Sequence, residues 1–319
     1  MGKVNITAED LSTSAKKFRK ELLMQPVHAL GRSLAHMTLR TGIRYEEVVG
    51  ELSGDIEIGP YSETRIDDDD VAINPRRLRT YLGSVVKPFS PNSVYQTIYG
   101  SAITKGQGLT TVEIARTIAT FLAAKIGAGL DRHLFDAVRN DKGNQTVDLV
   151  NGFDTITASE IAAGNLSAEL GNLYTFPEAI DATNAVDAIK EFCRSASDFL
   201  QETENAKLFL PRPLYNAYLD DYKATTGSTP YNKEFKQTFV EGFDNIAFVP
   251  MYQKRGSEFL HLTTKSNMLV GVNQQGEEEQ LEIEKHAAFV LQFIATLFFG
   301  VNFESLDSSR ILVGKLFSN

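Results

Sequence analysis

Four consecutive carboxylates are the strongest candidate for chemistry in this sequence. They are Asp67, Asp68, Asp69 and Asp70, and the basic residues Arg76, Arg77 and Arg79 come shortly afterwards. Clustered carboxylates can bind a divalent cation or act as general acids and bases. An acidic run and a basic run on an extended chain can instead pair with complementary charges on a neighbouring chain. The run is therefore a metal site, a solvated turn or a contact between chains.

The pattern argues against a metal ion. A calcium-binding loop has the form D-x-[DN]-x-[DN]-G with a distal glutamate, and no glycine follows Asp70. Consecutive side chains of an extended chain point to opposite faces, so at most two of the four aspartates can converge on one ion. We expect no metal here. A solvated turn and charge pairing with a neighbouring chain both remain open.

The other titratable residues form no catalytic pattern. None of the histidines has a second histidine or a cysteine three or four residues away; they are His28, His36, His133, His261 and His286. We expect ordinary surface or boundary histidines. The phosphate-binding, zinc-protease, redox and nucleophile-elbow motifs GxxxxGK[ST], HExxH, CxxC and GxSxG are absent from the sequence. We predict no catalytic residue, no cofactor and no enzymatic activity.

Two further groups of residues that could carry chemistry are better explained by structural roles. Asp220 and Asp221 are adjacent acids, but on a helix their side chains point about 100° apart, which favours a solvated helix face. Cys193 falls on an apolar stripe with Ile189 and Phe192. A cysteine in such a position behaves as a small, inert core residue.

Composition limits the function classes further. The chain has 319 residues, a net charge of −9 and a pI near 5.2. Holding nucleic acid by phosphate neutralisation needs a concentrated positive face, so the charge disfavours that class but not a protein that encloses nucleic acid. A single cysteine indicates a reducing compartment. The most apolar run, Ala287–Val301, falls short of the ~20 residues of a membrane span, so we expect a soluble cytoplasmic protein.

The residues around the acidic run predict an extended ribbon. Short alternating runs separated by glycine and proline fill residues 50–100, after an arm of short helical pieces in the first 50 residues. Two arms of ~20 residues would make a hairpin ~65 Å long. Because an isolated two-stranded ribbon is marginal in water, it would need a surface to lie on.

A long helix follows the ribbon. Thr110–Glu113 is a capping box, and the pattern of apolar residues predicts a helix ending near Asn140 or Gly143. The apolar residues recur every four positions, at Ile114, Ile118, Leu122, Ile126, Leu130 and Leu134. At ~30 residues this helix would be ~45 Å long.

The remaining residues predict an α+β arrangement. We expect a helix from near Thr183 to Leu200 and a second helix at Leu214–Tyr222, opened by Pro213. Phe289–Phe303 fits a helix or a strand by periodicity, and its aromatic and β-branched residues favour a strand. Further strands are predicted at Lys207–Leu210, Ile246–Pro250, Met268–Val272, Leu281–Glu284 and Ile311–Val313.

The order of these elements resembles the major capsid proteins of tailed bacteriophages, with the Hong Kong 97-type fold. LTTVEIARTIATFLAAKIGAGLDRHLFDAVRNDKG resembles the family's spine helix and the loop after it, and DNIAFVPMY resembles a strand ending in proline. KSNMLVGVNQQGEEEQLEIEKHAAFVLQFIATLFFGVNFESLDSSRILVGKL resembles its closing strands. The resemblance implies an α+β fold with an N-terminal arm (1–49), an extended loop hairpin (50–104), a peripheral domain (105–143 and 273–319) and an axial domain (144–272).

The resemblance also implies a function. Copies would assemble through hexamers and pentamers into an icosahedral shell around double-stranded DNA, without sequence-specific binding, in the bacterial cytoplasm and then in the virion. Portal, scaffolding and decoration proteins would be further partners, and no membrane is involved. Some relatives carry a scaffolding segment before the arm or cross-link subunits through a lysine and an asparagine, and no residues here match either feature.

Within such a shell the charged residues of the ribbon would contact neighbouring subunits. The acidic run would lie near the tip of the ribbon, and the basic residues would lie on its returning strand. Both would face complementary charges on a neighbour and help to set the register between subunits. The residues expected at this contact are Asp67, Asp68, Asp69, Asp70, Arg76, Arg77 and Arg79.

Two alternatives stay open. An encapsulin-like nanocompartment shell has the same architecture and encloses an enzyme in place of a genome. A cytosolic metal-dependent α+β enzyme, using Asp67–Asp70 or Asp220 and Asp221 with Mg²⁺, belongs to a different class. The absence of a convergent His/Asp/Glu motif weighs against the enzyme.

Overall fold

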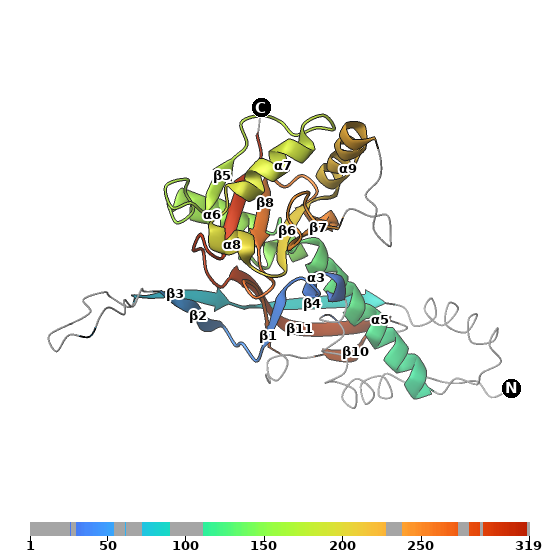
Figure 1. Ribbon diagram of the computed structural model, residues 1–319. Helices are drawn as coiled ribbons and strands as arrows, with labels where there is room; N and C mark the ends of the chain where they lie inside the picture. Colours follow the sequence, from blue (N-terminus) through green and yellow to red (C-terminus); the bar gives the residue numbers. More distant parts are fainter. Residues whose placement is uncertain are drawn as a thin grey trace. The chain divides into compact units, whose positions relative to one another are not determined.

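The computed structural model describes residues 26, 30–53, 61, 72–89, 111–227, 238–273, 281–287 and 290–317. These residues form two compact units (Figure 1). Unit 1 comprises Met1–Tyr45, Thr80–Thr155 and Val270–Val301; unit 2 comprises Glu46–Arg79, Ile156–Leu269 and Asn302–Asn319. The first 25 residues of the expected arm lie outside the described residues, as do Asp55–Ile58 and Thr110.

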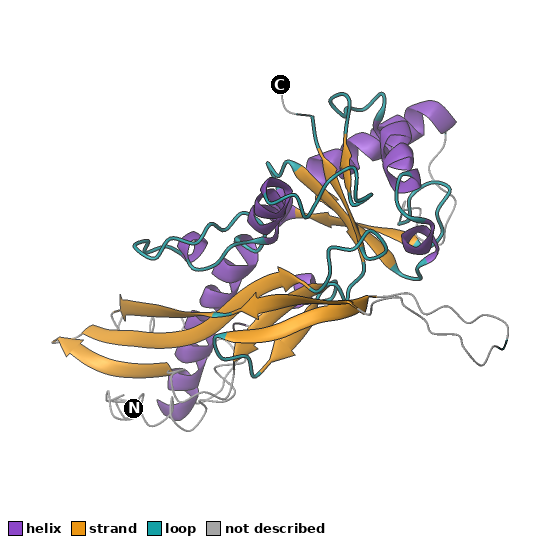
Figure 2. Ribbon diagram, turned by 90° about the vertical axis from the view of Figure 1, so that its left-hand side faces the viewer, coloured by secondary structure: helices purple, strands orange, loops and turns teal. Residues whose placement is uncertain are grey.

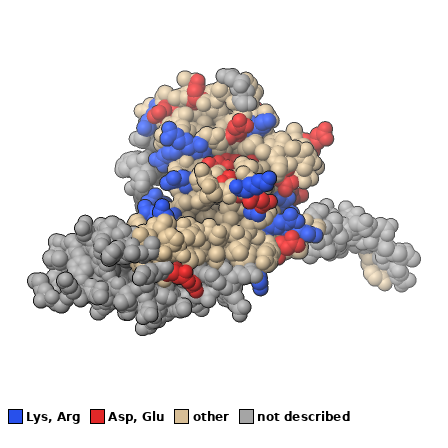
Figure 3. All heavy atoms as spheres, turned by 180° about the vertical axis from the view of Figure 1, so that it is seen from behind, with Lys and Arg blue, Asp and Glu red and all other residues tan. Residues whose placement is uncertain are grey.

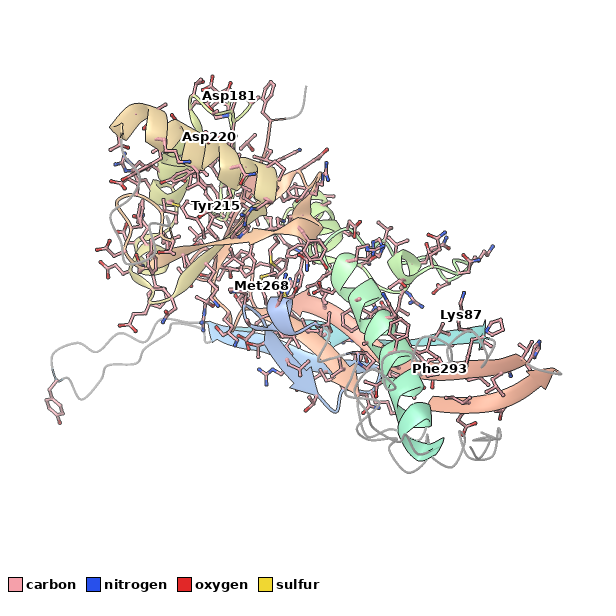
Figure 4. All side chains as sticks on the ribbon, turned by 90° about the vertical axis from the view of Figure 1, so that its right-hand side faces the viewer. Lys87, Asp181, Tyr215, Asp220, Met268 and Phe293 are labelled. Carbon is pink, nitrogen blue, oxygen red and sulfur yellow. The ribbon has the colours of Figure 1, made fainter. Side chains whose placement is uncertain are left out.

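Unit 1 is built on a five-stranded sheet. Its path is β1 (Thr38–Thr41), β9 (Met268–Asn273), β11 (Val290–Phe303) and β10 (Leu281–Ala287), and β4 (Tyr81–Phe89) also pairs with β11. The helix α5 (Thr111–Arg132) packs on one face of this sheet, where Ala119 and Ala123 meet Ile283 and Phe293. Figure 4 labels Phe293 beside α5. The short helix α3 (Gly31–Leu34) precedes β1.

The strand prediction for the C-terminal apolar run is confirmed. β11 runs from Val290 to Phe303, and its first half alternates between half-buried and buried residues. The other strands predicted in the second half of the chain are also present, as β6, β7, β9, β10 and β12. Each lies within two residues of its expected bounds or extends them.

The long helix is shorter than predicted, because α5 ends at Arg132. Its 22 residues span about 33 Å. After Arg132 the backbone carbonyls of Leu134, Phe135 and Ala137 accept hydrogen bonds from the N–H groups of residues 152–154. These later residues take the acceptors that a continuing helix would use. The apolar pattern goes on past Arg132 because Leu134 and Phe135 are themselves buried.

Unit 2 is a second sheet flanked by helices (Figure 2). The strand order is β5 (Leu173–Thr175), β12 (Ile311–Lys315), β8 (Phe259–Thr263), β6 (Ala206–Pro211) and β7 (Ile246–Met251). The helices are α6 (Phe153–Ala162, in this unit from Ile156 onward), α7 (Ala185–Arg194), α8 (Asp198–Glu202) and α9 (Arg212–Thr226), with the 3₁₀ turn η2 (Tyr252–Lys254). The 3₁₀ turn η1 (Thr146–Asp148) belongs to unit 1. The core lies between this sheet and the helices α7 and α9.

The single helix expected from Thr183 to Leu200 is two helices. α7 ends at Arg194, and the Ser197 hydroxyl accepts the Leu200 N–H at the start of α8. A serine at this position competes with a continuing helix by capping a new one. The helix after the proline is confirmed: α9 has Pro213 in its first turn and ends at Gly227, whose φ of 68° is left-handed.

The extended ribbon is present in part. β2 (Glu46–Ser53) pairs antiparallel with β3 (Ala72–Arg79), from Glu46 opposite Arg79 to Ser53 opposite Ala72. Figure 1 shows this pair in blue. The next strand differs from expectation, because β4 pairs with β11 in the unit 1 sheet and not with the ribbon. The exact domain boundaries stay a prediction.

Candidate assembly surface

The β2–β3 ribbon has two different faces. Strand alternation places Glu47, Leu78, Val49 and Arg76 on one side and the next residues on the other. On the first side Leu78 and Val49 are buried, so this inner face packs against the chain itself. On the second side Val48 is 66% exposed. The ribbon therefore presents an outer face that the described residues leave uncovered.

Arg76 anchors the inner face within unit 2. Its Nη2 donates to Glu160 Oε1 at 2.7 Å and to Asn302 Oδ1 at 3.1 Å, while its Nε donates to the Phe303 carbonyl at 3.1 Å. Asn302 returns a hydrogen bond to the Arg77 carbonyl at 2.9 Å. The Arg76 side chain is 17% exposed. These contacts fix the base of the ribbon to α6 and to the end of β11.

Arg77 and Arg79 belong to the outer face of the ribbon. Arg77 Nη1 is 3.3 Å from Glu46 Oε1, and Arg79 Nε is 3.4 Å from Glu46 Oε2. Both guanidinium side chains are 58% exposed. The guanidinium groups of Arg77 and Arg79 share the single carboxylate of Glu46. These three exposed side chains therefore have a net positive charge.

The three arginines do not form one outward strip. We expected all of them to face a neighbouring chain, but the two-residue period of a strand turns Arg76 inward and Arg77 and Arg79 outward. The expectation for Arg76 is therefore corrected, because its guanidinium is bound within its own chain. The role of Arg77 and Arg79 in contacts between copies stays a prediction.

The described residues do not test the expectation for the acidic run. We expected its four carboxylates to line up near the ribbon tip, facing a neighbouring copy. All four lie outside the described residues, in the part of the sequence that joins β2 to β3; they are Asp67, Asp68, Asp69 and Asp70. Their role in contacts between copies therefore stays a prediction.

The side chains of Asp220 and Asp221 lie on different faces of α9, as helical geometry requires. Asp220 is exposed, as predicted, but Asp221 is buried and is not part of a solvated face. Its Oδ2 accepts the Val186 N–H at 2.7 Å, at the first turn of α7. A carboxylate is favourable there because the first N–H groups of a helix have no partner within the helix. The spacing of Leu214, Tyr218 and Asp221 along one helical face was the signal for its burial.

His261 differs from the surface histidine that we expected. It is fully buried in β8, where its Nε2 lies 2.8 Å from Thr157 Oγ1 and its Nδ1 lies 3.1 Å from Lys254 Nζ. An ammonium group can only donate, so Nδ1 accepts from Lys254 and Nε2–H donates to Thr157. Burial and the Lys254 charge lower the pKa of His261 well below its usual range. The apolar residues on both sides of it in Phe259–Thr263 were the sequence signal for its burial.

Three of the other histidines and Cys193 are placed as expected. His36 and His133 are half-buried and His286 is exposed, while His28 lies outside the described residues. Cys193 is buried, and burial raises the pKa of its thiol to about 12. Within the described part of the chain, no three His, Cys, Asp or Glu side chains come together as metal ligands. None of the described helices has the length and apolar character needed to cross a bilayer.

The charges on the surface are mixed. On the face in Figure 3, Lys and Arg side chains alternate with Asp and Glu over the upper part of the picture. The coloured residues on this face form no single large basic patch of the kind that holds nucleic acid by its phosphates.

No protein-family model matches the chain, and no curated protein matches it in sequence. Solved structures do match in fold. A protein of the satellite phage P4 procapsid has a TM-score of 0.60 and 11% identity, covering 93% of this chain and 90% of that one. The capsid of an empty GTA particle has a TM-score of 0.56 and 12% identity, covering 91% and 90%.

A third solved structure is also similar in fold. The capsid of the Myoviridae phage XM1 has a TM-score of 0.53 and 9% identity, covering 88% of this chain and 90% of that one. The likeness extends over nearly the whole length of each chain. The expected α+β fold, the Hong Kong 97-type fold of phage capsids, is therefore confirmed.

Proposed function

We propose that this chain is a major capsid protein of a tailed double-stranded DNA phage or prophage, whose copies assemble into an icosahedral shell around the genome. The observation that carries the proposal is the β2–β3 ribbon, whose outer face exposes Val48, Arg77 and Arg79 on a fold shared with phage capsids. An exposed two-stranded ribbon gains stability from a surface to lie on. A neighbouring copy supplies that surface.

The chain would act as a structural component and not as an enzyme. Its shell would be made of hexamers and pentamers, with portal, scaffolding and decoration proteins as further partners in the virion. Assembly would take place in the cytoplasm of a bacterial host. The net charge of −9 suits a shell that confines DNA without binding it tightly.

Electron microscopy of the purified protein tests the proposal. We expect rings or closed shells of uniform size at micromolar concentration. A species that stays monomeric at every concentration and ionic strength, measured by analytical ultracentrifugation, contradicts it. Particles purified from cells should contain nuclease-resistant double-stranded DNA. An enclosed enzyme without DNA would favour a nanocompartment shell.

The acidic run of the ribbon has its own test. Replacing Asp67, Asp68, Asp69 and Asp70 with serine should reduce shell formation and leave the unfolding temperature unchanged, since we propose that these carboxylates pair with a neighbouring copy. If this variant assembles normally, the run is a solvated turn.

A matched control removes the same charge elsewhere. It replaces four exposed acids outside the ribbon with serine: Glu169, Glu202, Glu204 and Asp220. The control should assemble normally. Equal losses in both variants would show that assembly responds to total charge and not to the acidic run.

A further inference from the structure

Lys207 is a charged side chain within the unit 2 sheet. It is the second residue of β6, which lies between β7 and β8 in that sheet (Figure 1). Leu208 and Leu210 of the same strand belong to the core that includes residues of α7 and α9. Because side chains alternate along a strand, Lys207 lies on the opposite face of the sheet. The other residues of β6 are buried, and Lys207 itself is half-buried.

The neighbouring strands give Lys207 no charged partner. The residues paired with it are Ala247 of β7 and Thr263 of β8. The Thr263 hydroxyl donates to the Arg310 carbonyl at 2.7 Å and accepts a hydrogen bond from Asn267 Nδ2 at 3.0 Å. Within the part of the chain that the structure describes, no hydrogen bond or ion pair joins the Lys207 ammonium group to another residue.

A second cation acts on Lys207. Lys265 follows Thr263 by two residues, in the turn after β8. Burial, and then the charge of Lys265, lower the pKa of the Lys207 ammonium group below its ordinary value. Both causes favour the neutral amine, because a partly buried cation beside a like charge is relieved when it loses its proton.

These surroundings make the Lys207 amine a better nucleophile at neutral pH than an exposed lysine. Only a neutral amine has a lone pair that can attack a carbonyl carbon, and an ordinary lysine, with a pKa of about 10.4, is almost entirely protonated at pH 7. Partial burial and an adjacent cation are two means by which proteins activate a lysine amine. The half-buried position still leaves the amine within reach of a small reagent.

We propose that Lys207 is a modification site, whose amine takes an acyl group from small activated donors of the acyl phosphate class in preference to the exposed lysines of the chain. The Nζ lone pair attacks the acyl carbon, so a C–N bond forms and the bond from that carbon to the phosphate oxygen breaks. The phosphate leaves with the bonding electrons, and the proton lost by the nitrogen goes to the phosphate or to water. The amide product is neutral, which removes the repulsion with Lys265. This inference does not depend on the proposed function.

Acetylation by acetyl phosphate tests the inference. The full chain is treated at pH 7.5, and peptide mass spectrometry measures the initial rate of acetylation at each lysine. Lys207 should react at least about threefold faster than the exposed Lys142 and Lys223. Accessibility alone predicts the opposite order, because Lys207 is the most buried of the three. A rate at Lys207 equal to theirs or lower overturns the inference.

Substitutions of the neighbouring lysine separate its charge from its size. Lys265→Gln removes the like charge and should lower the rate at Lys207 at least about twofold, whereas Lys265→Arg keeps the charge and should preserve the rate. The matched control Lys223→Gln removes an exposed lysine elsewhere and should leave the rate at Lys207 unchanged. Equal rates at Lys207 in Lys265→Gln and Lys265→Arg overturn the inference.

The pH dependence gives a readout that a purely structural lysine does not show. Because the pKa of Lys207 is lowered, its rate advantage over Lys142 and Lys223 should be largest near neutral pH. The advantage should shrink as the pH rises toward 10, where ordinary lysine amines also lose their protons. Circular dichroism checks that each variant is folded at each pH. An advantage of the same size at pH 7.5 and pH 10 contradicts the inference, since it does not follow proton loss.

Discussion

Arg76 Nη2 and Glu160 Oε1 lie 2.7 Å apart, and this ion pair joins strand β3 to helix α6 across 84 residues of sequence. Both side chains are largely shielded from solvent, at 17% and 16% exposed. Glu160 also accepts from Asn165 Nδ2 through its other oxygen, so neither carboxylate oxygen lacks a donor. The pair is part of the structure that holds the ribbon at its base.

Removing this anchor should destabilise the protein. Arg76→Ala leaves the Glu160 carboxylate without its charged partner, and the free energy of unfolding should fall by about 1–3 kcal/mol. Urea unfolding at neutral pH measures it. In a double-mutant cycle with Glu160→Ala, the coupling energy should be about 1 kcal/mol or more. Additive effects would show that the two side chains act independently.

The buried Asp221 should matter more than its exposed neighbour. Asp221→Ala removes the carboxylate that accepts the Val186 N–H, and the loss of such a cap costs about 0.5–2 kcal/mol. The matched variant Asp220→Ala should change stability by less than about 0.5 kcal/mol, because its side chain is exposed. Thermal or urea unfolding of the two variants compares them directly. Equal losses would contradict the capping role.

Stability should fall in mild acid because of His261. Its pKa is lowered in the folded protein, so the unfolded chain binds the proton more readily, and stability is lost as pH falls below about 6.5. The slope contributed by this one residue is at most about 1.4 kcal/mol per pH unit. Urea unfolding between pH 8 and pH 5 measures it.

The variant His261→Gln should flatten this pH dependence, even if it lowers stability at pH 8. The matched variant His133→Gln, at a partly exposed histidine beside Asp136, measures how a histidine-to-glutamine change elsewhere in the chain affects the slope. An unchanged slope in His261→Gln would assign the acid sensitivity to other groups.

Cys193 should be unreactive in the folded protein. The thiolate is the reactive form, and burial raises the pKa of this thiol to about 12, so little thiolate exists at neutral pH. A thiol reagent such as Ellman's should label less than one-tenth of the protein within the time that labels the urea-unfolded chain completely. Rapid labelling without denaturant would show that the core around α7 opens readily.

Much of the fold could be predicted from the sequence, because several helices and strands have local sequence signals. β11 was predictable from aromatic and β-branched residues at alternating positions, and α9 from Pro213 and Gly227 at its ends. The end of α5 could not be predicted from its own residues. It depends on hydrogen bonds from the N–H groups of residues 152–154 to carbonyls that a longer helix would use. The place of β4 depends on a partner strand about 200 residues away, which no local pattern reveals.

The candidate site was predictable in part. The charged residues around the ribbon stood out in the sequence, and strand alternation alone could have separated Arg76 from Arg77 and Arg79. The partners of Arg76 could not have been foreseen, since they come from distant parts of the chain. The burial of Lys254 was likewise hidden, because burial of a polar residue depends on what packs around it.

The register of the ribbon limits the changes of length that the chain can accept. Glu46 to Ser53 is held against Ala72 to Arg79 from the base, where Arg76 is anchored. A one-residue slip would exchange the inner and outer faces, so changes of length inside either strand are costly. Residues gained or lost between Ser53 and Ala72 leave those eight pairs untouched. Evolution could therefore change the number of residues between Ser53 and Ala72 while keeping the paired strands and their attachment unchanged.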